Sequence, residues 1–120
     1  MSSSKSERLN PMVITDPESG HEYTLEFSRK TVAKTEAAGL DVNRLDSESM
    51  TMVPLMFWGA FLMHHPHITR EQTDKILFDG LGGLTGDEMA YIGKLYAEPF
   101  KTLIISGESE ENPRKMAVKF

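Results

Sequence analysis

Apolar side chains are densest in residues 50–63, where no charged residue occurs and only Gly59 interrupts the apolar run after Thr51. At helical spacing no face of this segment would be polar, which is the pattern of a buried helix. The run is too short to cross a bilayer, which requires about 20 apolar residues. With Thr51 as N-cap, Pro54 would lie in the first turn, where backbone N–H groups have no intrahelical partner. The pattern predicts a central helix over about 52–65.

Two short segments before this helix have the composition and alternation of strands, residues 12–15 and residues 21–27. In the second segment, apolar and polar side chains alternate, which is the period of a half-buried strand. The connection between them offers Pro17 at the second turn position and Gly20 where a positive φ is needed. We therefore expect a β-hairpin over 12–27.

Helix caps divide most of the remaining chain. Ser28 precedes a weakly amphipathic segment, and Gly39 follows it, which predicts a short helix over 29–38. Two capping boxes, in which a Thr is followed three residues later by Gln or Glu, begin at Thr69 and Thr85. They predict helices over 70–81 and 86–106. Pro99 should kink or divide the last helix because it removes a backbone hydrogen bond, and Gly107 should end it.

The chain of 120 residues, 39% of them hydrophobic, has the length of one domain with one core. We predict an α+β, mainly α-helical fold in which the hairpin is followed by about four helices within a single domain over 11–107. The polar, Ser-rich residues 1–10 are expected to be a disordered arm. Residues 108–120 are expected to be a flexible tail, although their last five residues are largely apolar.

The net charge of −5 and the pI near 5.3 argue against nucleic acid or anionic lipid as a partner. The absence of Cys excludes disulfides and thiolate metal sites from this sequence. The first residues lack the apolar core of a signal peptide. These features predict a soluble intracellular protein that binds neither nucleic acid nor membrane.

His64, His65 and His67 put three imidazoles within four residues. A zinc ion could use two of them with a distant carboxylate. The spacing does not match a helical HxxxH pair, and Pro66 interrupts the helix between them. Histidines at a helix C-terminus also interact favourably with its last carbonyls and its dipole. We therefore expect no metal and no other cofactor, and keep a His-metal site as an alternative.

The other candidate sites match no known catalytic pattern. The glycine-rich connection 79–88 lacks both the alternating Asp/Asn ligands of an EF-hand and the Gly-Lys-Ser/Thr ending of a phosphate loop. Ser106 is not part of a nucleophile elbow. The acidic candidates have no apolar pocket assigned to them that would raise a pKa; they are Glu36, Asp46, Glu48 and Glu71. We expect a protein that is not an enzyme.

The central helix is the remaining candidate for function because it concentrates methionine and aromatic residues, which are enriched at adaptable binding surfaces. These side chains could all be core of the monomer. However, the elements predicted around the helix have narrow apolar stripes, which favours partial exposure to another chain. The predicted interaction residues are Met52, Met56, Phe57, Trp58, Phe61 and Met63.

The order of these elements resembles that of the tail assembly chaperones of long-tailed, siphovirus-type bacteriophages and prophages. The resemblance extends from about Val13 to Leu81. It consists of element order and hydrophobic blocks, carried by the segments Tyr23–Phe27, Glu36–Gly39, Leu55–Met63 and His64–Gln72.

The resemblance implies a non-enzymatic protein that acts in the cytoplasm of a bacterial host. Such a chaperone binds the tape measure protein, keeps it soluble, helps to recruit tail tube protein and leaves the finished tail. Self-association and a longer frameshifted product are also implied. Two other hypotheses remain open, a permanent structural or connector protein of the phage particle and a small His-metal-dependent enzyme. Persistence in the finished particle separates the first of these from a chaperone.

Overall fold

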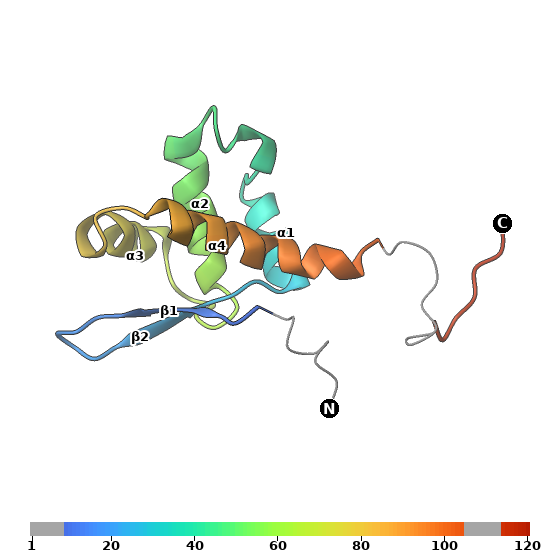
Figure 1. Cartoon of the computed structure of the whole chain (residues 1–120), viewed down its shortest axis with the longest axis horizontal. Coiled ribbons are helices and arrows are strands. Elements are labelled where there is room, and N and C mark those ends of the chain that lie inside the picture. Colours follow the sequence, from blue (N-terminus) through green and yellow to red (C-terminus); the bar gives the residue numbers. More distant parts are fainter. Residues whose placement is uncertain (1–8, 105–113) are drawn as a thin grey trace.

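The computed structural model describes residues 9–104 and 114–120. Within these residues, a two-stranded β-hairpin is followed by four α-helices and short 3₁₀ and π turns, which confirms the predicted α+β, mainly helical class. The hairpin forms one layer, and the helices lie over one of its faces (Figure 1). The elements in chain order are β1 (Met12–Thr15), β2 (Glu22–Leu25), α1 (Arg29–Ala37), η2 (Val42–Arg44), α2 (Ser49–Phe61), α3 (Arg70–Lys75), η3 (Ile76–Gly80), α4 (Gly86–Ala97) and η4 (Glu98–Thr102).

The predicted hairpin is present, with β1 and β2 antiparallel. Met12 lies opposite Leu25, and Ile14 lies opposite Tyr23. These four side chains point to the face that packs against the core, because alternate residues of a strand share a face. Gly20 has φ 76°, which supplies the left-handed residue that the connecting loop requires.

Helix α1 begins and ends at the predicted signals. The Ser28 hydroxyl accepts the Thr31 N–H at 3.2 Å, and the Thr31 hydroxyl accepts the Ser28 N–H at 2.9 Å. Gly39, with φ 118°, follows the helix. The Tyr96 hydroxyl of α4 donates to Glu36 of α1 at 3.0 Å, and burial raises the pKa of Tyr96, so this hydroxyl stays protonated and joins the two helices.

The predicted start and end of the central helix were wrong. Helix α2 runs from Ser49 to Phe61, not from 52 to 65, and Thr51 is not its N-cap. The first helical bond comes one turn earlier than predicted, from the Met52 N–H to the Glu48 carbonyl at 2.9 Å. Pro54 therefore lies inside the helix and leaves the carbonyl four residues before it without a helical donor.

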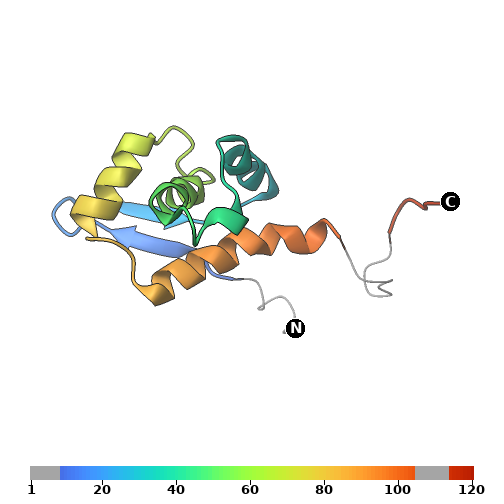
Figure 2. The same cartoon turned by 90° about the horizontal axis from the view of Figure 1, so that it is seen from above.

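The central helix is enclosed by its own chain more completely than the sequence pattern predicted. Buried side chains from β2, α1, η3 and α4 belong to the same core cluster, and α4 crosses the helix (Figures 1 and 2). The core members outside α2 are Leu25 in β2, Phe27 just after it, Val32 and Leu40 around α1, Leu77 in η3, and Ile92, Leu95 and Tyr96 in α4. The narrow apolar stripes suffice because several elements each contribute one to three large side chains.

Helices α1 and α2 approach most closely at Gly59. A Cβ added there would lie 2.2 Å from the Thr35 hydroxyl oxygen and 2.6 Å from its methyl carbon. Thr35 is fully buried, and its hydroxyl donates to the Thr31 carbonyl at 2.7 Å. Gly59 is thus the point where the backbone of α2 contacts the Thr35 side chain of α1, rather than a break in the apolar run.

The predicted helix over 70–81 divides into α3 and a π turn, η3. The capping box is confirmed, since the Thr69 hydroxyl accepts the Gln72 N–H at 3.1 Å. In η3 the Leu81 N–H donates to the Ile76 carbonyl, five residues back, at 2.9 Å. The wider turn leaves Leu77 buried while Phe78 is 50% exposed.

The predicted helix over 86–106 also divides. The Thr85 capping box is confirmed, with the Glu88 N–H donated to the Thr85 hydroxyl at 3.0 Å. Helix α4 ends at Ala97, and the chain continues as the 3₁₀ turn η4 with Pro99 in its first turn. The predicted effect of the proline is therefore confirmed. The predicted stop at Gly107 lies outside the described residues.

The two predicted termini are described only in part. Of the predicted arm, residues 1–8 lie outside the described residues. Leu9 packs against the core, and the Asn10 carbonyl accepts a hydrogen bond from the Tyr91 hydroxyl at 2.7 Å, so these two residues belong to the folded domain. Of the predicted tail, Arg114–Phe120 are described and exposed.

Candidate functional site

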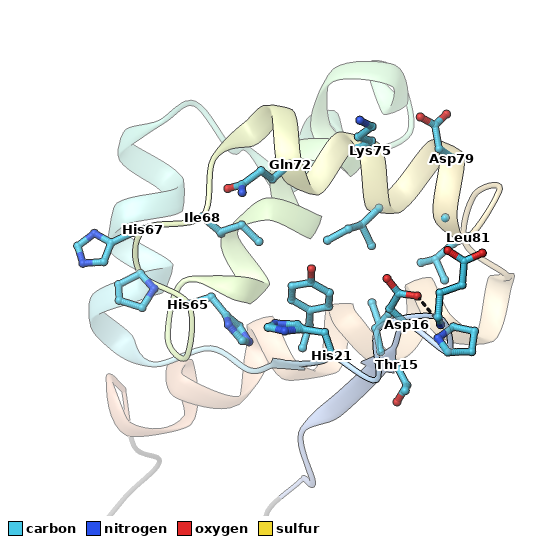
Figure 3. A pocket seen from close by; sticks show the side chains of 17 residues that line it. Thr15, Asp16, His21, His65, His67, Ile68, Gln72, Lys75, Asp79 and Leu81 are labelled. Atoms are coloured by element: carbon cyan, nitrogen blue, oxygen red, sulfur yellow. Dashed lines mark hydrogen bonds between the residues drawn. The ribbon is translucent and has the colours of Figure 1, made fainter.

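A groove of about 1020 Å³ lies between the hairpin and the helical segment α3–η3. One wall is the hairpin from Ile14 to Tyr23, and the opposite wall is formed by residues 72–81 (Figure 3). The connection over residues 65–68, which follows α2, closes one end. We call this feature the hairpin groove. The sequence did not predict it, because its walls come from segments about 58 residues apart.

The hairpin groove has an apolar floor and a polar rim. The large apolar side chains of the floor are Ile14, Tyr23, Ile68, Ile76 and Leu81, and Pro17 and Pro66 also line the groove. Gln72, Lys75 and Asp79 lie along the helical wall, and Thr15, Asp16 and His21 lie along the hairpin wall (Figure 3). An open cleft of this composition suits apolar side chains of a ligand whose polar groups remain at the rim.

The hairpin end of the rim carries negative charge. Asp16 accepts the Glu18 N–H at 2.9 Å, and this backbone hydrogen bond lowers the pKa of the Asp16 carboxyl. The loop therefore presents an ionised carboxylate at neutral pH. Lys75 and Asp79 on the facing wall supply one group of each sign. The rim can thus pair with polar groups of either charge on a ligand.

The three clustered histidines separate in the structure. His65 Nε2 accepts the Thr24 N–H at 3.0 Å, and burial lowers the pKa of His65. His64 Nε2 lies 2.8 Å from a carboxylate oxygen of Glu26. The ring of His67 lies at the edge of the groove and points away from it (Figure 3). Among residues 9–104 and 114–120, no three His, Cys, Asp or Glu side chains come together in a way that could hold a metal ion.

His65 instead belongs to an aromatic cluster that connects the groove with the core. The Tyr23 ring lies 4.5 Å from the His21 ring, 5.5 Å from the His65 ring and 5.6 Å from the Phe61 ring, all between centroids. Phe61 in turn lies 5.0 Å from Phe57. The Tyr23 ring in the groove floor therefore packs directly against the buried C-terminal end of α2.

Four of the six predicted interaction residues lie inside the domain. Met52, Met56, Phe57 and Phe61 are at most 2% exposed and form the core. The expectation that they face another chain is therefore not met in this conformation, because the hairpin and the other helices already cover them. The prediction underestimated how completely the other elements of the same domain bury these four side chains.

The other two predicted residues are at least partly accessible. Met63 is 37% exposed. Trp58 is half-buried, its indole N–H donates to the Ile68 carbonyl at 3.2 Å, and the Arg70 guanidinium lies 6.0 Å from its ring centroid. Since Ile68 lines the hairpin groove, Trp58 helps to hold one end of that groove in place.

The part of the chain that the structure describes contains no helix long and apolar enough to cross a membrane. Comparisons with curated proteins and with solved structures found no significant match. The profile of one family, described as "Domain of unknown function (DUF5055)", matches residues 1–120. Because this match covers the whole sequence, the chain belongs to the DUF5055 family.

Proposed function

We propose that the chain is a tail assembly chaperone of a long-tailed bacteriophage or prophage. It binds the tape measure protein, keeps it soluble, helps to recruit tail tube protein in the host cytoplasm, and is absent from the finished tail. The resemblance in element order from Val13 to Leu81 supports this function. The observation that carries the binding role is the hairpin groove.

The size and lining of the groove suit a segment of a helical client. Its volume, about 1020 Å³, is at the upper end of the range of small-molecule pockets, and it is open along one side. An amphipathic helix binds such a groove through a few apolar side chains on one face. Ile76 and Leu81 on one wall and Ile14 on the other would contact those side chains, while the charged rim would contact the polar flanks of the client.

The state of His65 supports binding rather than catalysis. Its Nε2 atom already accepts a backbone N–H, so that atom's lone pair is occupied by a structural hydrogen bond. The same bond fixes the neutral ring with its proton on Nδ1. In this arrangement the imidazole shapes the wall of the groove.

The proposal is tested with the tape measure protein encoded in the same genome. Sizing chromatography with light scattering should show a co-eluting complex that keeps this client soluble. Leu81→Lys places a charge on the apolar floor and should weaken the complex by roughly tenfold or more. Val42→Lys is the matched control, because Val42 is 45% exposed, close to the 38% of Leu81, and lies outside the groove on η2.

Two results would contradict the proposal. If the parent chain formed no complex, the chaperone function would be wrong; if both variants bound as well as the parent, the groove would not be the client site. Mass spectrometry of finished tails distinguishes a chaperone from a permanent connector protein of the particle. A chaperone should be missing from them, whereas a connector protein would be present in fixed stoichiometry.

A further inference from the structure

The two edges of the hairpin differ. The outer edge of β2 is closed by the end of α2, because the Thr24 N–H donates to His65 Nε2 at 3.0 Å and the Glu26 N–H donates to the Ala60 carbonyl at 2.9 Å. Both amides therefore point away from β1. In an antiparallel ladder, this makes the pair Val13–Thr24 a non-hydrogen-bonded pair.

The outer edge of β1 is open. Since Val13 is in a non-hydrogen-bonded pair, its N–H and C=O point away from β2, and those of Thr15 do the same two residues later. Within residues 9–104 and 114–120, no hydrogen bond is made to these outward groups. The Val13 side chain is 52% exposed. Such an edge is a template for pairing with another extended chain.

Residues 114–120 have the sequence pattern of a β-strand but are not part of the two-stranded sheet. Apolar Met116, Val118 and Phe120 alternate with other residues, which is the period of a strand. These three side chains are 83%, 62% and 115% exposed. We call Arg114–Phe120 the basic segment, because it contains Arg114 and two lysines and no carboxylate side chain.

The charge of the hairpin is opposite to that of the basic segment. Residues 9–27 contain Asp16, Glu18, Glu22 and Glu26 but no Lys or Arg. Two of these, Glu22 and Glu26, lie in or beside β2, and the other two lie in the loop. A strand with three cationic side chains would therefore be attracted to this layer, more strongly at low salt.

We propose that the basic segment of one copy adds to β1 of a second copy as a third strand. In both views the segment lies at the end of the molecule opposite the hairpin loop (Figures 1 and 2), which leaves it free to reach a neighbour. A contact between two different surfaces of identical chains continues from copy to copy, so the chains associate head to tail. This inference specifies how the self-association in the proposed function occurs, and its test omits the client, so the two can fail separately.

The test uses two variants of the full chain. Val13→Pro removes the outward N–H without removing a bond to β2, and proline is tolerated at such an edge position. Val118→Asp places a negative charge in the basic segment. Each variant alone should remain monomeric in light scattering at concentrations where the parent chain grows in mass. For Val13→Pro the association constant should fall roughly 2- to 12-fold, as expected for a lost hydrogen bond of typical strength.

Mixing the two variants tests pairing between copies. The Val13→Pro chain retains its basic segment, and the Val118→Asp chain retains its open edge, so an equimolar mixture should form dimers and nothing larger. Val13→Thr, which keeps the amide, should associate like the parent. A monomeric mixture, or a parent chain that stays monomeric at all concentrations, would overturn the proposal.

Amide hydrogen exchange provides a measurement that does not depend on the folding of a variant. In the parent chain, protection of the Val13 and Thr15 amides should rise with protein concentration and fall with added salt. Protection of the Thr24 amide, which is already bonded within the chain, should not change. Amide exchange at Val13 and Thr15 that does not depend on protein concentration would contradict the proposed addition of a third strand to β1.

Discussion

On one side of α2, the Thr35 side chain of α1 lies so close to Gly59 that a Cβ there would have no space. On the other side, the hairpin and the α3–η3 wall stand apart and leave the hairpin groove. Both sides are attached to the same apolar helix, but the first is held by close packing and the second by hydrogen bonds at its margin. The difference indicates that α2 is the fixed centre of the domain and that adaptable binding belongs to the side where the walls do not meet.

Phe61→Ala should have the largest effect on stability, because Phe61 is fully buried and its ring packs against those of Tyr23, Phe57 and His65. Loss of its ring should lower the free energy of unfolding by about 3–5 kcal/mol. Phe78→Ala is the control, since Phe78 is 50% exposed and should change the same quantity by less than about 0.5 kcal/mol. Urea denaturation measures both, and similar costs would show that the core does not centre on α2.

Gly59→Ala tests the close packing of α1 against α2. The added methyl group overlaps Thr35, so unfolding free energy should fall by about 1–3 kcal/mol. Gly93→Ala, within α4, meets nothing within 4 Å and should instead raise it by about 0.5–1 kcal/mol. Thermal melts of the two variants should shift in opposite directions, and a shift in the same direction would contradict the close approach of α1 and α2.

His65→Leu tests the groove side. It removes the acceptor of the Thr24 N–H, and an unsatisfied, partly buried amide costs about 1–3 kcal/mol. His65→Gln, whose side-chain carbonyl can accept the same bond, should recover part of that loss. Urea denaturation of both variants provides the comparison. Equal stability of the two would mean that the hydrogen bond contributes little.

Lowering the pH should reduce the free energy of unfolding through His65 on the groove side of α2, by less than the substitutions above. Burial, followed by the charges of His64 and His21, lowers the pKa of His65 below its ordinary 6.5. The unfolded chain therefore binds this proton first, so the contribution of His65 is complete above pH 6.5 and is lost as the pH falls towards the folded-state pKa. Unfolding free energies measured from pH 8 to 5 should show this slope in the parent, a smaller slope in His64→Gln because one of the contributing charges is lost, and none of it in His65→Gln. An unchanged slope in His65→Gln would assign it to another group.

The features that the sequence predicted correctly are local ones. The capping residues Ser28, Thr69 and Thr85 act within three residues of themselves, and Gly20 and Pro99 act through their own backbone geometry. Such effects can be recognised in one segment without knowledge of its neighbours.

The features that were missed depend on distant segments. The closure of the core around Met56 and the meeting of His21 with His65 require the folded chain, and no periodicity encodes them. The π turn after Lys75 keeps nearly the same apolar spacing as an α-helix, so the pattern could not reveal it. The start of α2 was placed too late because proline usually occupies the first turn of a helix. In this helix Pro54 lies inside instead.

The attachment of β2 to the end of α2 also has a consequence for the order of events during synthesis. A two-stranded hairpin is at best marginally stable alone, and the partner of Thr24 lies 41 residues further along the chain. The hairpin strands therefore leave the ribosome before the residue that supports them and lack this support until His65 has emerged. We expect stalled nascent chains that end before His65 is exposed to be cut by protease within the hairpin, and chains that also expose His65 to resist. The hairpin of this protein folds only after the end of α2 has been made.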